Sequence, residues 1–101
     1  MSVKKQYIKT SPECKVTFIL AKEIAASVNR ANLVGDFNNW DVESIPMKKL
    51  KTGEFSATVN LAKGKEYQFK YLLNRSEWVN ENKADKYVPN EFQSENSVIV
   101  V

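Results

Sequence analysis

The stretch "GEFSATVNLAKGKEYQFKYLLN", residues 53–74, decides the fold. Two runs that alternate apolar and polar residues flank a turn at Gly64. Their apolar positions are Phe55, Ala57 and Val59 before the turn and Tyr67, Phe69 and Tyr71 after it. Because successive side chains of a strand point to opposite faces, the pattern predicts two strands that each turn one face to a core. We expect a hairpin at Gly64, with Lys70 pointing away from the aromatic face.

Similar signals extend in both directions along the chain. Upstream, Thr52-Gly53 marks a second hairpin turn, and the runs "CKVTFIL" (14–20) and "RANLVGDF" (30–37) have strand character. The segment 21–29 between them is expected to be a connecting loop, and "NSVIVV" (96–101) to be the closing strand. About seven short strands without a helical period indicate an all-β antiparallel sandwich. Residues 1–13 are expected to form an N-terminal extension or edge strand, ahead of a sandwich over 14–101.

Composition restricts the class of protein. The chain has 101 residues, a net charge of +3 and 27% charged residues, which fits one folded domain. Its lysines alternate with acids along the sequence, which favours a solvated surface over a nucleic-acid site. With a single cysteine, Cys14, and no histidine, we expect no disulfide, metal or cofactor, and a small, partly buried residue at Cys14. The sequence shows neither a signal peptide nor a membrane span, so a cytoplasmic location is expected.

Catalytic chemistry finds no support in the residue pattern. No Gly-x-Ser-x-Gly turn, Gly-rich phosphate loop or imidazole base is present. Five carboxylates are notable, but no pair stands out by its spacing: Asp36, Asp41, Glu43, Glu77 and Asp85. Asp36 and Asp41 sit beside turn-forming residues and are expected to accept hydrogen bonds from nearby backbone. The chain is therefore not expected to be an enzyme.

Aromatic, amide and lysine side chains make up the candidate binding site. Trp40 follows Asn38 and Asn39, Trp78 lies on a polar segment, Lys70 is on an outward strand face, and Asn96 precedes the last strand. Flat rings and directional hydrogen-bonding groups suit a sugar, which has apolar C–H faces and a belt of hydroxyls. The alternative is that both tryptophans cap the core and that the asparagines only form a turn. The residues alone leave both interpretations open.

A family resemblance favours the sugar. The order "VNRANLVGDFNNWD", "YQFKYLL", "EW" and "NSVIVV" closely resembles the family-48 carbohydrate-binding modules, also called isoamylase N-terminal or early-set domains. These include the glycogen-binding domain of the AMP-activated protein kinase β-subunit, and the tail resembles free-standing bacterial members. The resemblance implies an immunoglobulin-like sandwich that binds α-1,4-linked glucan, such as glycogen or starch. It also implies the binding residues, which are Trp40, Lys70, Trp78 and Asn96, with Asn39 and Phe92 as further contacts.

Two departures from the family leave alternatives. The turn "NRSEW", Asn74–Trp78, is one residue longer than the family's and lacks its glycine, which could displace Trp78. No catalytic (β/α)₈ barrel of about 250 residues is present, so the module is expected to be non-catalytic. The alternative is a protein-interaction module in which Trp40, Tyr87 and Phe92 dock a glucan-metabolising protein or a second copy. Nucleic acid and membrane are not expected partners.

Overall fold

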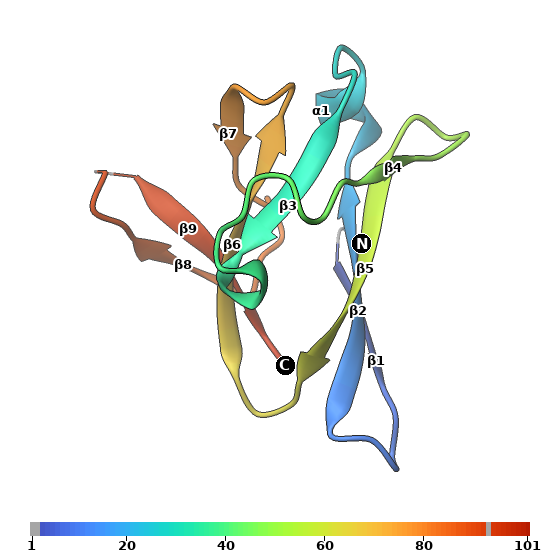
Figure 1. Cartoon of the computed structure of the whole chain (residues 1–101), viewed down its shortest axis with the longest axis vertical. Helices are drawn as coiled ribbons and strands as arrows, with labels where there is room; N and C mark the ends of the chain where they lie inside the picture. Colours follow the sequence, from blue (N-terminus) through green and yellow to red (C-terminus); the bar gives the residue numbers. More distant parts are fainter. Residues whose placement is uncertain (1–2, 93) are drawn as a thin grey trace.

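Two antiparallel sheets face each other in a sandwich (Figure 1), and the computed structural model describes residues 3–92 and 94–101. Sheet A has the order β1-β2-β5-β4, with β1 Val3–Tyr7, β2 Glu13–Leu20, β5 Phe55–Ala62 and β4 Lys48–Lys49. Sheet B has the order β3-β6-β9-β8, with β3 Ala31–Gly35, β6 Glu66–Leu73, β9 Glu95–Val100 and β8 Lys86–Pro89. The three-residue strand β7, Glu77–Val79, also pairs with β6. The predicted all-β sandwich is confirmed.

The described residues form nine strands, whereas about seven were expected. Strands β7 and β8 lie inside the polar segment 75–95, which precedes the closing strand. A run of three or four residues is too short to show a period of two. A second difference is α1, Lys22–Ala25, a single helical turn inside the expected loop 21–29. Its last residue, Ala25, is fully buried.

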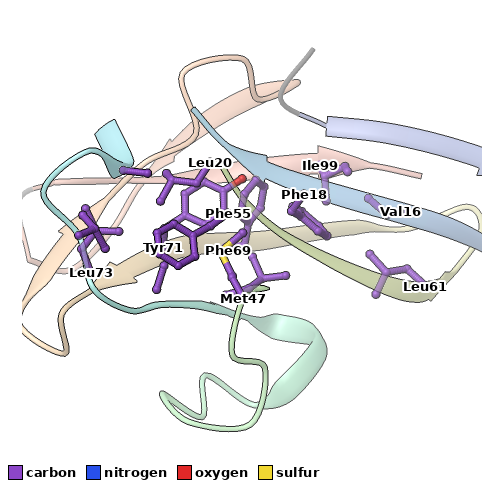
Figure 2. Close-up of a cluster of buried hydrophobic side chains, with 14 of the residues drawn as sticks. Val16, Phe18, Leu20, Met47, Phe55, Leu61, Phe69, Tyr71, Leu73 and Ile99 are labelled. Atoms are coloured by element: carbon purple, nitrogen blue, oxygen red, sulfur yellow. The ribbon is translucent and has the colours of Figure 1, made fainter. Parts of the chain in front are cut away.

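The core fills the space between the two sheets (Figure 2). Sheet A supplies Val16, Phe18, Leu20, Phe55 and Leu61, and sheet B supplies Phe69, Tyr71, Leu73 and Ile99. The rings of Phe69 and Tyr71 pack edge to face, with centroids 5.8 Å apart. Cys14 belongs to the same cluster and is fully buried, so its thiol has no solvent contact. The alternation in 55–71 therefore predicted the core faces correctly.

The expected hairpin at Gly64 is wrong. Strands β5 and β6 belong to different sheets, so the turn over residues 63–65 carries the chain across the sandwich (Figure 1). Alternation and a glycine turn are common to hairpins and to such crossings, and only the partner strands differ. The amide of Gly64 donates to the carbonyl of Val101, at 2.8 Å, instead of to a hairpin partner. The upstream hairpin at Thr52-Gly53 is confirmed, because β4 and β5 pair antiparallel.

The open edges of the sandwich are tied by two links. Residues 45–47 run beside the free edge of β3, where the amide of Leu33 donates to the carbonyl of Ile45 and the amide of Met47 donates to that of Ala31. The chain then enters sheet A as β4. At another edge, Nζ of Lys5 on β1 lies 2.8 Å from a carboxylate oxygen of Asp85. No helix among the described residues is long and apolar enough to cross a membrane.

Candidate functional site

The outward face of sheet B carries most of the candidate site. On β6, Phe69 and Tyr71 are buried in the core, so Gln68 and Lys70 point to the other face. Strand β9 pairs with residues 66–69 of β6, and β7 pairs with residues 71–73. These two strands therefore follow one another along β6, and Lys70 lies where one ends and the other begins.

Trp78 belongs to this outward face. It pairs with Leu72 of β6, two residues from Lys70, and 45% of its surface is exposed. The longer turn before it is well anchored, because the side-chain oxygen of Asn74 accepts the amides of Asn29 and Arg30 at 2.9 and 3.2 Å. Asn74 and Arg75 adopt positive φ angles of 50° and 62° in place of a glycine. The extra residue is absorbed in the turn, and Trp78 remains on the same face as Lys70.

Trp40 reaches the site from the loop that follows β3. The short 3₁₀ helix Asp36–Asn38 ends at Asn39, and both Asn39 and Trp40 have positive φ angles, of 56° and 57°. This region is unfavourable for a bulky residue, so other contacts must hold it. The Trp40 amide donates to the Gly35 carbonyl at 2.9 Å, and the indole Nε1 donates to Oδ1 of Asp36 at 2.9 Å. Hydrogen bonds thus fix Trp40 both at its backbone amide and at its indole ring.

The side chains of Asn38 and Asp41 stabilise the backbone of the same loop. Oδ1 of Asn38 accepts the Gly35 amide at 3.0 Å, and its Nδ2 donates to the Asp41 carbonyl and to the Ser44 hydroxyl. Asp41 accepts the Glu43 amide at 2.9 Å. Asp36 also accepts the backbone amide of Gln68, at 2.8 Å, which joins the loop to β6. The expected role as an acceptor of nearby backbone amides is confirmed for Asp41, whereas Asp36 accepts the Trp40 indole and the amide of Gln68 on a different strand.

A chain of amide side chains borders the other end. Nδ2 of Asn96 donates to Oε1 of Gln68 at 3.0 Å, and Nδ2 of Asn90 donates to Oδ1 of Asn96 at 3.0 Å. Oδ1 of Asn90 accepts the amides of Phe92 and Ser94, which shapes the turn that carries Phe92. This turn leaves the Phe92 ring 78% exposed.

Together these residues line one surface groove of about 860 Å³. Its walls are Trp40, Val42, Gln68, Lys70, Trp78, Asn90, Glu91, Phe92, Ser94 and Asn96. Five of the six residues singled out in the sequence are in this set, and Asn39 is not. Asn39 instead occupies the left-handed position that turns the chain toward Trp40. Gln68 and Asn90 were not singled out, although the alternation in "YQFKY" already placed Gln68 on the same face as Lys70.

A buried polar network supports the groove from beneath. Glu81 is 3% exposed, and its Oε1 accepts the hydroxyl of Tyr71 at 2.8 Å. Burial, followed by the nearby Glu81 carboxylate and its hydrogen bond, holds the pKa of Tyr71 well above its ordinary value of 10.0. The Ser97 hydroxyl accepts the Glu81 amide and donates to Oδ1 of Asn80. Through Asn80 the network reaches the strand that carries Asn96.

The backbone carbonyl of Glu95 is where this network meets the groove. It accepts Nδ2 of Asn80 at 2.9 Å and Nζ of Lys70 at 3.0 Å. One lysine hydrogen is thereby used to orient the ammonium group, and an ammonium has three to donate. Lys70 therefore remains able to donate to a ligand in the groove.

The proposed protein-docking patch of Trp40, Tyr87 and Phe92 is not one surface. Tyr87 pairs with Ser97, which in turn pairs with the core residue Phe69. Tyr87 is therefore on the inward face of sheet B, whereas Trp40 and Phe92 line the outward groove. Its hydroxyl donates to the Glu81 carbonyl. Within the part of the chain that the structure describes, no cluster of three metal-binding side chains occurs.

A groove with two indoles, amides and one ammonium group fits a ligand that has flat apolar faces and many hydroxyls. Comparison with known families agrees with this chemistry, because residues 11–88 match the model of carbohydrate-binding module 48, the isoamylase N-terminal domain. The chain belongs to this family. The resemblance seen in the sequence is thus confirmed, and the module is a member of a carbohydrate-binding class. Phe92, Ser94 and Asn96 lie beyond the matched residues.

Two curated relatives share part of the module. One is a 1,4-alpha-glucan-branching enzyme of Aspergillus oryzae, which is 44% identical over 46 residues, or 46% of this chain. Another is the 1,4-alpha-glucan-branching enzyme of Saccharomyces cerevisiae, which is 43% identical over 60 residues, or 58% of this chain. The matched segments cover only 7% and 8% of the two enzymes. The module thus corresponds to a small part of each.

Proposed function

We propose that the module binds α-1,4-linked glucan without catalysing a reaction on it. One observation carries the proposal: Trp40, Lys70, Trp78 and Asn96 come from four separate segments and line the same groove. If the two tryptophans only capped the core, nothing would require them to line one groove together with a lysine and several amide side chains. The names of the related enzymes, which specify 1,4-alpha-glucan, support this class of sugar.

Each group has a definite part in the proposed complex. The indoles of Trp40 and Trp78 stack on the apolar faces of glucosyl units, because flat rings offer rigid contact area at low entropic cost. The Lys70 ammonium and the Asn96 amide hydrogen-bond to sugar hydroxyls, and Phe92 covers the chain from the rim. The groove volume of about 860 Å³ lies within the roughly 300–1,000 Å³ of small-molecule sites, which suits a short stretch of glucan.

The groove chemistry supports a non-catalytic role. Hydrolysis of a glycosidic bond uses two carboxyl groups placed on either side of it, about 5–9.5 Å apart. Among the described residues that line the groove, Glu91 is the one carboxylate. The acid that lies nearest to Trp40, Asp36, is engaged by the indole and by the Gln68 amide. A second carboxylate is therefore missing from the wall.

Affinity electrophoresis through gels that contain glycogen or soluble starch tests the proposal. We expect the wild-type protein to be retarded, and the double variant Trp40→Ala, Trp78→Ala to migrate as it does in a gel without glucan. The control is Tyr7→Ala, which removes an exposed aromatic side chain from sheet A and should leave retardation unchanged. Wild-type migration equal to that of the double variant in every glucan gel would refute the proposal.

A further inference from the structure

Charge is unevenly divided between the two sheets. Sheet A with its turns, residues 3–20 and 48–65, holds nine lysines and two glutamates, a formal charge of +7. Sheet B with its loops, residues 31–47 and 66–101, holds four basic and nine acidic residues, a formal charge of −5. The small net charge of +3 conceals this separation. The groove lies on the acidic sheet, and the basic sheet is on the other side of the sandwich (Figure 1).

We call the outward side of sheet A the basic face. The strand register places its side chains together, because paired residues of an antiparallel sheet point to the same side. They are Lys4 and Gln6 on β1, Glu13, Lys15, Thr17 and Ile19 on β2, Ser56, Thr58, Asn60 and Ala62 on β5, and Lys48 on β4, so three lysines share the face with one glutamate. The hydroxyls of Thr17 and Thr58 are 3.2 Å apart. All three lysines are exposed.

The lysines of sheet A are largely without acidic partners inside the molecule. Among the residues that the structure describes, Lys5 is the only one of the nine within 4.0 Å of a carboxylate, at Asp85. The two acids of the sheet, Glu13 and Glu54, form no ion pair in the described residues. At the end of β1, Tyr7 and Ile8 are 54% and 46% exposed beside Lys63, whose Nζ donates to the Ile8 carbonyl. Tyr7 pairs with the core residue Cys14, so it stands on the inward side of sheet A and does not belong to the basic face.

We propose that the basic face is a docking surface for an acidic region of another protein. The module would then act from two sides, with glucan in the groove of sheet B and a protein rich in Asp and Glu on sheet A. Charge complementarity identifies the occupant, because unpaired lysines of one sign steer and orient an oppositely charged surface. The docking proposal does not depend on glucan binding, since no residue of the groove belongs to the basic face.

The features of this face favour a protein over other polyanions. Between the lysines stand hydroxyl and amide groups, which suit the directional hydrogen bonds of a protein surface. No aromatic side chain stands among the outward residues of these strands, so single-stranded nucleic acid would find no stacking platform. A flat sheet face also does not enter the major groove of a duplex, where proteins use a helix or a two-stranded ribbon.

The size of the face predicts a transient complex. Strands β2 and β5 each contain eight residues, which extend about 27 Å, and four strands span about 19 Å in the other direction. The resulting area of roughly 500 Å² is below the ~800 Å² per partner of a standard stable interface. We therefore expect rapid, salt-sensitive binding.

Backbone amide shifts of the ¹⁵N-labelled protein during titration with poly-L-glutamate test the proposal. The shifts should map to β1, β2 and β5 and leave the amides around Trp40 and Trp78 unmoved. The charge-reversal variant Lys4→Glu, Lys15→Glu, Lys48→Glu should bind at least tenfold more weakly. The matched control is Arg75→Glu, Lys83→Glu, Lys86→Glu, which changes the net charge equally but lies in sheet B, and it should keep most of the affinity. Far-ultraviolet circular dichroism establishes that both variants are folded.

Three results would overturn the proposal. The first is the absence of shifts with poly-L-glutamate at about 0.15 M salt, and the second is an equal loss of binding in both triple variants. The third is tighter binding, at matched charge concentration, of a DNA duplex or of phosphatidylserine vesicles to the same face. Glycogen added to the complex should not displace poly-L-glutamate. If glycogen fails to bind while the shifts on sheet A persist, the glucan proposal fails and the docking proposal stands.

Discussion

Asp36 is the residue on which the orientation of Trp40 depends. One of its carboxylate oxygens accepts the indole Nε1 and the other accepts the amide of Gln68, so a single side chain fixes the loop to β6 and the ring to the loop. Trp40 needs such support, because its left-handed backbone conformation is unfavourable and must be held by surrounding contacts.

Replacing Asp36 by Ala should therefore weaken glucan binding by several-fold and destabilise the fold by about 1–3 kcal/mol, because two hydrogen bonds worth about 0.5–1.5 kcal/mol each are lost. Isothermal titration with maltoheptaose and urea unfolding measure the two effects. Asp41→Ala is the control, because Asp41 accepts one amide in the same loop but does not touch Trp40. Equal loss of affinity in both variants would mean that Asp36 does not position the indole.

At the residue scale, the sequence predicted which residues line the groove better than it predicted how each residue is positioned. Residue type and a family motif were enough to single out Trp40, Lys70, Trp78 and Asn96. Asn39 is not among the residues that line the groove, and it occupies the left-handed position at which the chain turns toward Trp40. Gln68 was overlooked because a glutamine on a strand has no distinctive pattern.

At the scale of elements, the pairing of β3 with β6 sets the position of the groove. Gly35 ends β3 opposite Phe69, and the loop to Trp40 begins directly after it. A Cβ atom at Gly35 would lie 2.5 Å from the Gln68 carbonyl oxygen and 2.8 Å from Cβ of Phe69. Neither neighbour can rotate away, so the strands approach this closely only because the residue is glycine.

Gly35→Ala should lower the free energy of unfolding by about 3 kcal/mol, the upper end of overpacking costs, which corresponds to a fall of roughly 12–24 °C in Tm for a domain of this size. The control is Gly64→Ala, where φ is +80° and no atom lies within 4 Å of the added Cβ. That variant should lose only about 1–2 kcal/mol, the cost of a left-handed residue. Differential scanning calorimetry measures both, and a smaller loss at Gly35 than at Gly64 would contradict the packing argument.

The sequence predicted strands where the alternation of apolar and polar residues extended over many positions. It did not predict which strands pair with each other. Eight-residue strands such as β2 and β5 show their inward face in the sequence, because four alternations are visible. The crossing at Gly64 looks like a hairpin because local sequence determines that the chain turns but not which sheet it then enters. That choice depends on the contacts of Gly64 and Lys65 with Val101, at the far end of the chain.

At the scale of the whole molecule, the ion pair between Lys5 and Asp85 joins β1 of sheet A to the segment before β8 of sheet B. Partial burial opposes ionisation of Asp85. The hydrogen bonds from Lys5 and from the Val100 amide, together with the lysine charge, outweigh it and hold the pKa below its ordinary value of 3.8.

Because this pKa is lower in the folded than in the unfolded chain, the group stabilises the fold fully above pH 3.8, and this contribution is lost as pH falls through the folded pKa. We expect the stability of the wild-type protein to decline in that acidic range and the decline to be shallower in Asp85→Asn. Urea unfolding at a series of pH values from neutrality to about pH 2 measures the slopes. Parallel curves for the two proteins would show that Asp85 does not contribute to acid unfolding.

The separation of charge between the sheets could not be predicted from the sequence. Lysines and acids alternate in short clusters along the chain, and a count by segment gave a mixed, solvated surface. Assigning each charge to a sheet requires the strand order, in which β5 joins β2 and not β6. Cys14 was expected to be partly buried, but it extends the inward face of Val16 and Phe18 and is fully buried with them.

The place of β9 in sheet B also determines which fragment of this chain can fold. The family match stops at residue 88, but β9 lies between β6 and β8 and is a central strand. An excised fragment of residues 11–88 would lack Asn96, and the strand that β8 pairs with would also be missing. The folding unit extends to the end of its last buried strand, beyond residue 88. For this module the two boundaries differ by an entire strand.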